Sequence, residues 1–174
     1  MTHFDFVKKF NNQLSAISYY QQLSIAIEVC KKLYCNYLLF IEKYQWGNPD
    51  ILLDAIDMLE QSKTRQIELD SINTTLQNID SIMPEMSDYE MSDYLPNYGF
   101  AACLAVYSSV KFLSTKQSEC ICDIGINFTD IIYFKLSKHE DLTDDEIDDH
   151  PLMIDARNYL FETANNTPLT SPRL

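Results

Sequence analysis

The chain of 174 residues has the length of one domain and can bury roughly 70% of the surface that its unfolded form would expose. Hydrophobic residues at 46% and charged residues at 22% are typical of a globular protein and exclude disorder along the whole chain. A formal net charge of −13 excludes nucleic acid as the main partner and disfavours an anionic membrane, because both depend on clustered Lys and Arg.

Apolar residues recur at three- and four-residue intervals along most of the chain, which contains only three glycines, a pattern typical of an all-α protein. The first predicted helix passes through Tyr20 and continues until Trp46-Gly47, where Gly47 serves as its C-terminal stop. Asn48-Pro49 begins the next helix, with asparagine as the cap and proline in the first turn. A third long helix is predicted over residues 69–83 and ends at Pro84.

The second half of the chain contains the most apolar predicted helix, which follows Pro96 and covers residues 97–114. Its low polarity favours a central position in the fold. The residues predicted to face inward are Phe100, Cys103, Leu104, Tyr107 and Val110. Residues 118–138 form the next predicted helix, which has an apolar face of its own.

The last helical region is predicted from its start and stop signals. Thr143-Asp-Asp-Glu146 has the spacing of a capping box, and Pro151 should interrupt or restart the helix that follows. Residues 165–174 contain two prolines and few apolar residues, so we expect this tail to fray. The elements together predict one all-α domain over residues 1–164, a bundle of about seven or eight helices.

The N-terminal segment and the cysteines indicate a cytoplasmic protein. The first residues include acidic and polar side chains where a signal peptide would need an uninterrupted apolar run, and no stretch of eighteen consecutive apolar residues occurs. The five cysteines are an odd number, and each lies in an apolar or helical stretch. We therefore expect reduced, buried thiols at Cys30, Cys35, Cys103, Cys120 and Cys122.

Two short segments carry nearly all of the net charge. Residues 85–93 hold four acidic residues and residues 140–155 hold eight, without Lys or Arg in either. Such an asymmetric distribution produces a directed negative field, which suits a basic partner. Tyr89 and Tyr94 lie among the acids of the first segment and could anchor a partner that the charges steer. The predicted partner-binding residues are Glu85, Asp88, Tyr89, Glu90, Asp93, Tyr94, Glu140, Asp141, Asp144, Asp145, Asp148 and Asp149.

Other interpretations of these charges stay open. The acids of the second segment could simply be solvated, since a helix dipole stabilises acids in the first turn by about 0.3–1 kcal/mol each. A metal site is a further alternative, because five potential ligands lie close together: His139, Glu140, Asp144, Glu146 and His150. The segment lacks the ligand spacing of di-iron bundles and of calcium loops, so neither a metal nor another cofactor is predicted.

Catalytic motifs are missing from the sequence. No nucleophile elbow, Walker-type loop or dinucleotide-binding loop occurs, and three glycines could hardly build one. Asp54 and Asp57 are the nearest candidates for a carboxylate pair, and they fit better as the polar face of their helix. We therefore predict that the chain is not an enzyme.

Five short segments occur in order over residues 15–162: Leu33–Phe40, Trp46-Gly47, Ile82–Pro84, Ala102–Ala105 and Leu142–Ile147 followed by Pro151. In order and spacing they resemble the bacterial YjaG-like family. The resemblance implies a small, all-helical cytosolic protein of one domain, and it implies no activity, because the family has no assigned function. The chain departs from the family pattern at Ala101, where the resemblance leads us to expect an Asp.

From the charge placement we expect an acidic cytoplasmic module that binds a basic protein. Its most concrete form is an immunity protein that neutralises a nuclease-type toxin by occluding the toxin's active surface. The alternative is a housekeeping helical protein with a small-molecule or metal-dependent activity in a helical pocket. A third possibility is a self-associating structural protein, which predicts a dimer in solution; the sequence itself does not give the oligomeric state.

Overall fold

The computed structural model describes residues 1–90, 93–139 and 142–166. These ranges contain no strand, and they form eight α-helices and one short 3₁₀ helix, η1. In chain order these are α1 (His3–Ser15), α2 (Tyr19–Tyr44), α3 (Pro49–Gln61), α4 (Leu69–Ser81), η1 (Met86–Asp88), α5 (Leu95–Thr115), α6 (Ser118–His139), α7 (Asp144–Asp148) and α8 (Pro151–Asn166). The predicted all-α class and the predicted number of helices are confirmed.

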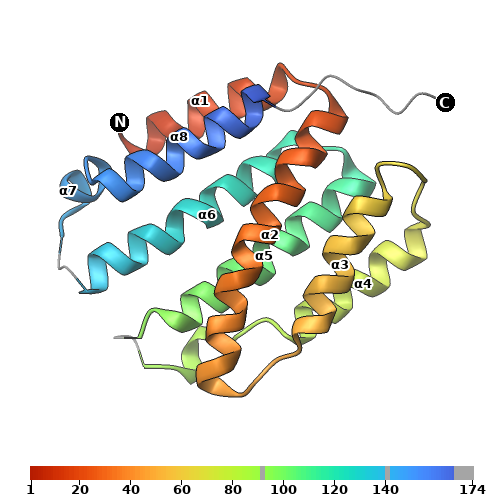
Figure 1. The fold of residues 1–174 in the computed structure, drawn as a ribbon, viewed down its shortest axis with the longest axis horizontal. Helices are drawn as coiled ribbons and strands as arrows, with labels where there is room; N and C mark the ends of the chain where they lie inside the picture. Colours follow the sequence, from red (N-terminus) through yellow and green to blue (C-terminus); the bar gives the residue numbers. More distant parts are fainter. Residues whose placement is uncertain (91–92, 140–141, 167–174) are drawn as a thin grey trace.

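Helices α2 and α5 pack against each other at the centre of the molecule (Figure 1). Helix α6 lies on one side of this pair, with α1 and α8 beyond it, and α3 and α4 cover the other side. Because α5 contacts α2, α3, α4 and α6, little of its surface reaches solvent, and the predicted central position is confirmed.

The inward face of α5 differs from the prediction. Phe100, Leu104 and Tyr107 are only half-buried, whereas Ala102 and Val106 are fully buried. Small side chains lie at the closest approaches between α5 and its neighbours, because they let helix backbones come together, and the larger residues fill the space beside them.

Helix α1 is an element that the sequence analysis did not predict. Its first turn is capped by the Thr2 hydroxyl, and it buries Phe6, Phe10 and Leu14 at four-residue spacing against α6 and α8. The approach to α6 is close: a Cβ added at Gly125 would lie 2.5 Å from a ring carbon of Phe10. Glycine at this position therefore allows α1 to join the core.

Most helix boundaries follow their predicted signals. The Asn48 side chain accepts a hydrogen bond from the Asp50 N–H (3.0 Å), and the proline at Pro151 starts α8 as predicted. The predicted stop at Gly47 is wrong, because α2 ends at Tyr44 and Gln45 adopts the left-handed conformation (φ 50°) at its end. The Gln45 N–H donates to the Ile41 carbonyl at 2.8 Å, which closes the helix before glycine is reached.

The C-terminal helix continues past residue 164, where the sequence analysis ends the domain. Asn165 lies within α8, and its side-chain oxygen accepts a hydrogen bond from Gln13 Nε2 at 2.7 Å. This contact ties the end of α8 to α1. The remainder of the predicted tail, residues 167–174, lies outside the described residues.

All five cysteines are free thiols, and four of them are buried. Burial raises the pKa of the Cys30 thiol to about 12, although a hydrogen bond with Ser109 opposes the shift, so this thiol stays protonated. The prediction for Cys35 is wrong, because this side chain lies on the exposed face of α2. No described helix has both the length and the apolar character to cross a membrane.

Candidate functional site

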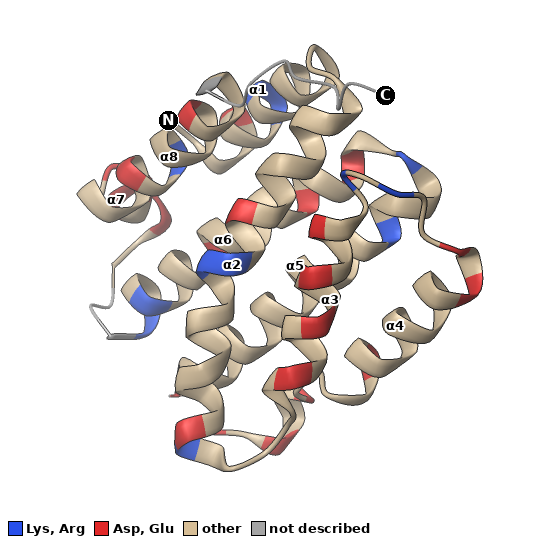
Figure 2. Cartoon of the chain, turned by 45° about the vertical axis from the view of Figure 1, so that its right-hand side comes forward, with Lys and Arg blue, Asp and Glu red and all other residues tan. Residues whose placement is uncertain are grey.

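The acidic segment 85–93 lies in the connection between α4 and α5, next to the C-terminal end of α2. Glu85, Asp88 and Glu90 are exposed, and they form no ion pair within the described part of the chain. They are the acids of this segment that face solvent. Along helix α3, Figure 2 shows a further row of acidic residues, and the exposed Asp54 and Asp57 belong to this helix.

Asp93 has a structural role instead. Its carboxylate pairs with the Lys43 ammonium, accepts a hydrogen bond from the Tyr44 hydroxyl, and caps the Leu95 N–H at 3.0 Å. Burial raises the pKa of the Asp93 carboxyl, but the contacts with Lys43, Tyr44 and Leu95 outweigh it and hold the pKa below its usual range. Asp93 fastens the acidic connection to the end of α2, so its charge is compensated within the fold.

The two tyrosines of this segment are packed against other rings. Tyr89 meets Tyr44 and Phe40 edge-on, with ring centroids 4.7 Å and 5.7 Å apart, and it is half-buried. Tyr94 packs against Tyr98 at 4.9 Å. Both rings therefore lie at the edge of the core and are partly covered by it.

A pocket of about 430 Å³ opens between the end of α2, the end of α4 and the acidic connection. Its lining consists of Tyr44, Trp46, Asp80, Ser81, Met83, Glu85, Asp88 and Tyr89. We call it the acidic aromatic pocket. It combines three aromatic rings with three carboxylates and contains no Lys or Arg, and both ring faces and carboxylates attract cations.

The buried ring of Phe40 packs against all three aromatic rings that line this pocket. Its centroid lies 5.2 Å from that of Tyr44, 5.7 Å from that of Tyr89 and 6.2 Å from that of Trp46. Trp46 itself remains 42% exposed. A fully buried ring thus holds three partly exposed rings in place, which is a preorganised arrangement for a ligand.

Sequence reasoning identified Glu85, Asp88 and Tyr89 but missed the opposite wall of the pocket. The sequence marks Trp46 only as a helix end, and it gives no sign that Asp80 belongs to a site. An aromatic residue in a polar turn is the signal that could have marked Trp46, since such residues are enriched where proteins bind others. That Trp46 and Glu85 line the same pocket follows only from the folded chain.

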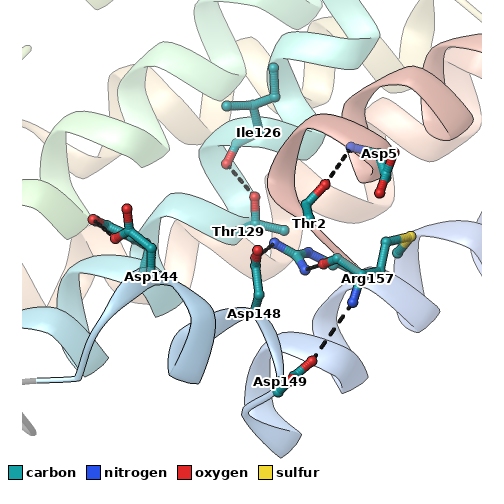
Figure 3. Close-up of polar contacts among 10 residues, drawn as sticks. Thr2, Asp5, Ile126, Thr129, Asp144, Asp148, Asp149 and Arg157 are labelled. Carbon is teal, nitrogen blue, oxygen red and sulfur yellow. Dashed lines mark hydrogen bonds and ion pairs between the residues drawn. The ribbon is translucent and has the colours of Figure 1, made fainter.

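The second acidic segment is organised around Arg157 of α8 (Figure 3). This guanidinium is 2% exposed, donates to Asp148 at 2.6 Å and also donates to the Met1 carbonyl. Asp149 lies 3.9 Å from the N-terminal amine. These charges therefore connect α7, α8 and the start of the chain, and they lie away from the pocket lining.

The remaining acids of the second segment have varied surroundings. Asp144 accepts a hydrogen bond from the Tyr133 hydroxyl at 2.8 Å. Glu146 accepts from the Thr143 N–H at 2.9 Å, as the predicted capping box requires. Asp145 is exposed. The predicted partner-binding residues Glu140 and Asp141 lie outside the described residues. Within those residues, no group of three or more His, Cys, Asp or Glu side chains is placed to hold a metal ion.

Asp130 of α6 is a half-buried carboxyl whose charge is poorly compensated. Burial raises its pKa, and the nearby His3 lowers it only in part. When the pH rises past the ordinary pKa of an Asp, the Asp130 carboxyl loses its proton in the unfolded chain before it does so in the folded protein. The contribution of Asp130 to the free energy of unfolding therefore falls with pH until the pKa of the folded state is passed. We expect Asp130→Asn to raise the melting temperature at neutral pH and to flatten its decline with pH, measured by thermal unfolding at several pH values.

The matched control for Asp130 is the exposed carboxylate Asp57, substituted in the same way. Asp57→Asn should leave the melting temperature nearly unchanged across the same pH range, because its carboxylate is solvated in both states. If Asp130→Asn destabilises the protein at neutral pH, the Asp130 carboxylate has a compensating partner and the assignment is wrong.

The fold and the site define a small all-α protein of one domain with an acidic aromatic pocket at one end. The sequence of residues 9–166 matches the family described as "Protein of unknown function (DUF416)", and the chain belongs to this family. A crystal structure of a DUF416 family protein from Shewanella baltica OS155 has a similar fold, with a TM-score of 0.79 and 23% sequence identity over 95% of this chain and 87% of that chain. No protein of curated function matches the sequence.

Proposed function

We propose that this protein binds a basic protein partner, and that the acidic aromatic pocket receives a Lys or Arg side chain of that partner. The pocket is the observation that carries the proposal. It places three carboxylates beside three rings that the core holds in position. A guanidinium or ammonium group would gain both ion pairs and cation–π contacts there.

The charges around the pocket support the same proposal. The ammonium of Lys43 lies 5.3 Å from the centroid of the Tyr44 ring and is paired with Asp93. Glu85, Asp88 and Glu90 are exposed and form no ion pair within the described chain, so they dominate the field beside the pocket. The whole chain has a net charge of −13, and the local negative field would steer a basic protein toward this end of the molecule and raise its association rate.

The most concrete form of the proposal is a cytoplasmic immunity protein without catalytic activity. It would neutralise a nuclease-type toxin by covering the basic surface with which the toxin holds nucleic acid. The five free cysteines fit a reducing compartment. We also propose that the chain is a YjaG-like protein within its family. The family match itself establishes membership of DUF416 and no finer name.

Trp46 provides a direct test, because it is the only tryptophan of the chain and lines the pocket. We expect a short Arg-rich peptide, titrated at low salt, to change Trp46 fluorescence in a saturable way. The variant Glu85→Gln with Asp88→Asn should weaken this binding by about tenfold, because it removes two of the three carboxylates.

The control variant neutralises two exposed acids of α8 that lie outside the predicted partner-binding set, Asp155→Asn with Glu162→Gln, and changes the net charge by the same amount. It should bind the peptide nearly as well as the unmodified protein. Equal losses in both variants would show that the peptide senses only net charge, and an unchanged Trp46 signal would show that the pocket takes no cation. Either result contradicts the proposal.

A second candidate function is a small-molecule role in a helical pocket. One observation favours it: a larger groove lies at the opposite end of α2, lined by residues of the reverse charge. Its ligand need not be related to the basic partner, and both could bind the same chain.

A further inference from the structure

A groove with a volume of about 810 Å³ lies where the connection between α3 and α4 faces the start of α2 and the end of α5. Tyr19 and Tyr20 begin α2 at this groove, whereas Tyr44 ends α2 at the acidic aromatic pocket. The full lining is Tyr19, Tyr20, Ser62–Leu69, Ile72, Leu113, Ser114 and Lys116. We call it the basic groove.

Cations are concentrated in this groove, although the protein as a whole is strongly acidic. Lys63, Arg65 and Lys116 line it, against a single carboxylate among the lining residues, Glu68. The Lys63 ammonium forms an ion pair with the Glu60 carboxylate at 2.9 Å. Arg65 and Lys116 form no ion pair within the described ranges. Figure 2 shows the basic residues on the connection between α3 and α4. Arg65 also donates to the Gln61 side chain and borders a second hollow lined by Asp54 and Asp57. Two cations without a salt bridge therefore line the same groove.

Backbone groups add to the positive potential. Helix α4 begins in the groove, and its N-cap residue Glu68 makes no side-chain cap hydrogen bond, which leaves the N–H groups of the first turn without that partner. The helix dipole makes this end positive, and the acidic residues Glu68 and Asp70 of the same turn offset part of that potential. The uncapped helix start and the two cations are independent features, and both favour an anion.

The uncharged lining is mixed: Ser62, Thr64, Gln66 and Ser114 are polar, and the other uncharged residues are aliphatic or tyrosine. Tyr19 is held by stacking on Phe112, with centroids 4.9 Å apart, and Lys116 lies 6.0 Å from the Tyr19 ring. Tyr20 is 37% exposed and packs edge-on against Tyr19. Such a surface would accept a flat organic group beside the anionic one.

We infer that the basic groove binds a phosphorylated small molecule with an aromatic ring, of the nucleoside monophosphate class. The phosphate would lie between Arg65, Lys116 and the start of α4, and the ring would stack on Tyr20. The volume of about 810 Å³ is in the range of small-molecule sites in proteins. This inference supplies the ligand class for the second candidate function and does not depend on the acidic aromatic pocket.

Isothermal titration calorimetry with AMP, adenosine and inorganic phosphate tests the inference. We expect AMP to bind at sub-millimolar concentration, and adenosine and phosphate to bind at least about tenfold more weakly, because each has only half of the required groups. Arg65→Gln with Lys116→Gln should weaken AMP binding about tenfold or more. Tyr20→Ala should weaken AMP binding and leave phosphate binding unchanged.

The matched control is Lys8→Gln with Lys135→Gln, which removes two exposed cations outside the groove and should leave AMP binding intact. Absence of AMP binding at millimolar concentration overturns the inference. So does adenosine binding as tightly as AMP, or equal weakening by the control and the groove variant. The peptide titration followed by Trp46 fluorescence reports on the acidic aromatic pocket at the other end of α2. A failure of the AMP titration therefore does not affect the test of the proposed function, and the reverse also holds.

Discussion

Replacing Phe40 with alanine is expected to lower the free energy of unfolding by about 3–5 kcal/mol, measured by urea denaturation. Phe40 is fully buried, and its ring lies against α5 so closely that a Cβ added at Gly99 would meet its Cγ at 2.8 Å. Removing the ring leaves a cavity at the contact between α2 and α5 that neighbouring side chains can fill only in part. The same change removes the support beneath Tyr44, Tyr89 and Trp46.

The effect on the pocket can be separated from the effect on stability. Even under conditions where Phe40→Ala is fully folded, we expect the peptide-induced change in Trp46 fluorescence to weaken, because the walls of the pocket lose their common contact. Phe4→Ala is the matched control, since Phe4 is 75% exposed and the same atoms are removed. A stability loss as small as that of Phe4→Ala would contradict the packing described for Phe40.

Replacing Arg157 with methionine is expected to cost about 3 kcal/mol of unfolding free energy, measured in the same way. The substitution preserves most of the apolar stem but leaves the Asp148 carboxylate without its partner. Asp148 keeps some contact with water, because 18% of its side chain is exposed. The loss of unfolding free energy should therefore lie at the low end of the range found when one partner of a buried ion pair is removed. The Met1 carbonyl and the face of the Phe6 ring also lose a contact.

Two further variants identify the cause of that loss. Arg65→Met makes the same chemical change at an exposed position and should cost little. Adding Asp148→Asn to Arg157→Met should recover part of the stability, because it removes the uncompensated charge. If the double variant is less stable than Arg157→Met alone, the isolated carboxylate is not the source of the destabilisation.

The helical class and most helix boundaries could be predicted because they depend on local chemistry. Asn48 and Pro151 act within one turn of their own position, and so do the apolar repeats of α2 and α6. The stop at Gly47 was mispredicted because Gln45 also tolerates the left-handed conformation. Helix α1 was missed because its three buried apolar residues stand among polar ones, and their burial depends on a close approach to Gly125 that the local sequence does not show.

The site was less predictable because it depends on contacts between distant segments. The sequence shows that Asp93 and Asp148 are acidic, but only the fold shows that Lys43 and Arg157 compensate them. It places Trp46 in a turn without showing that Glu85 lies across a pocket from it. Charge runs indicate where acids are abundant, and the tertiary structure decides which of them face solvent unpaired.

The most direct test of the proposed function is an affinity pull-down from cells of the native host, at low and high salt. Three baits are compared: the unmodified protein, the pocket variant Glu85→Gln with Asp88→Asn, and the control variant Asp155→Asn with Glu162→Gln. The proposal predicts one basic protein retained at low salt by the unmodified and control baits, released at high salt, and lost from the pocket variant. Retention of no basic protein at low salt, or equal retention by all three baits, would contradict it.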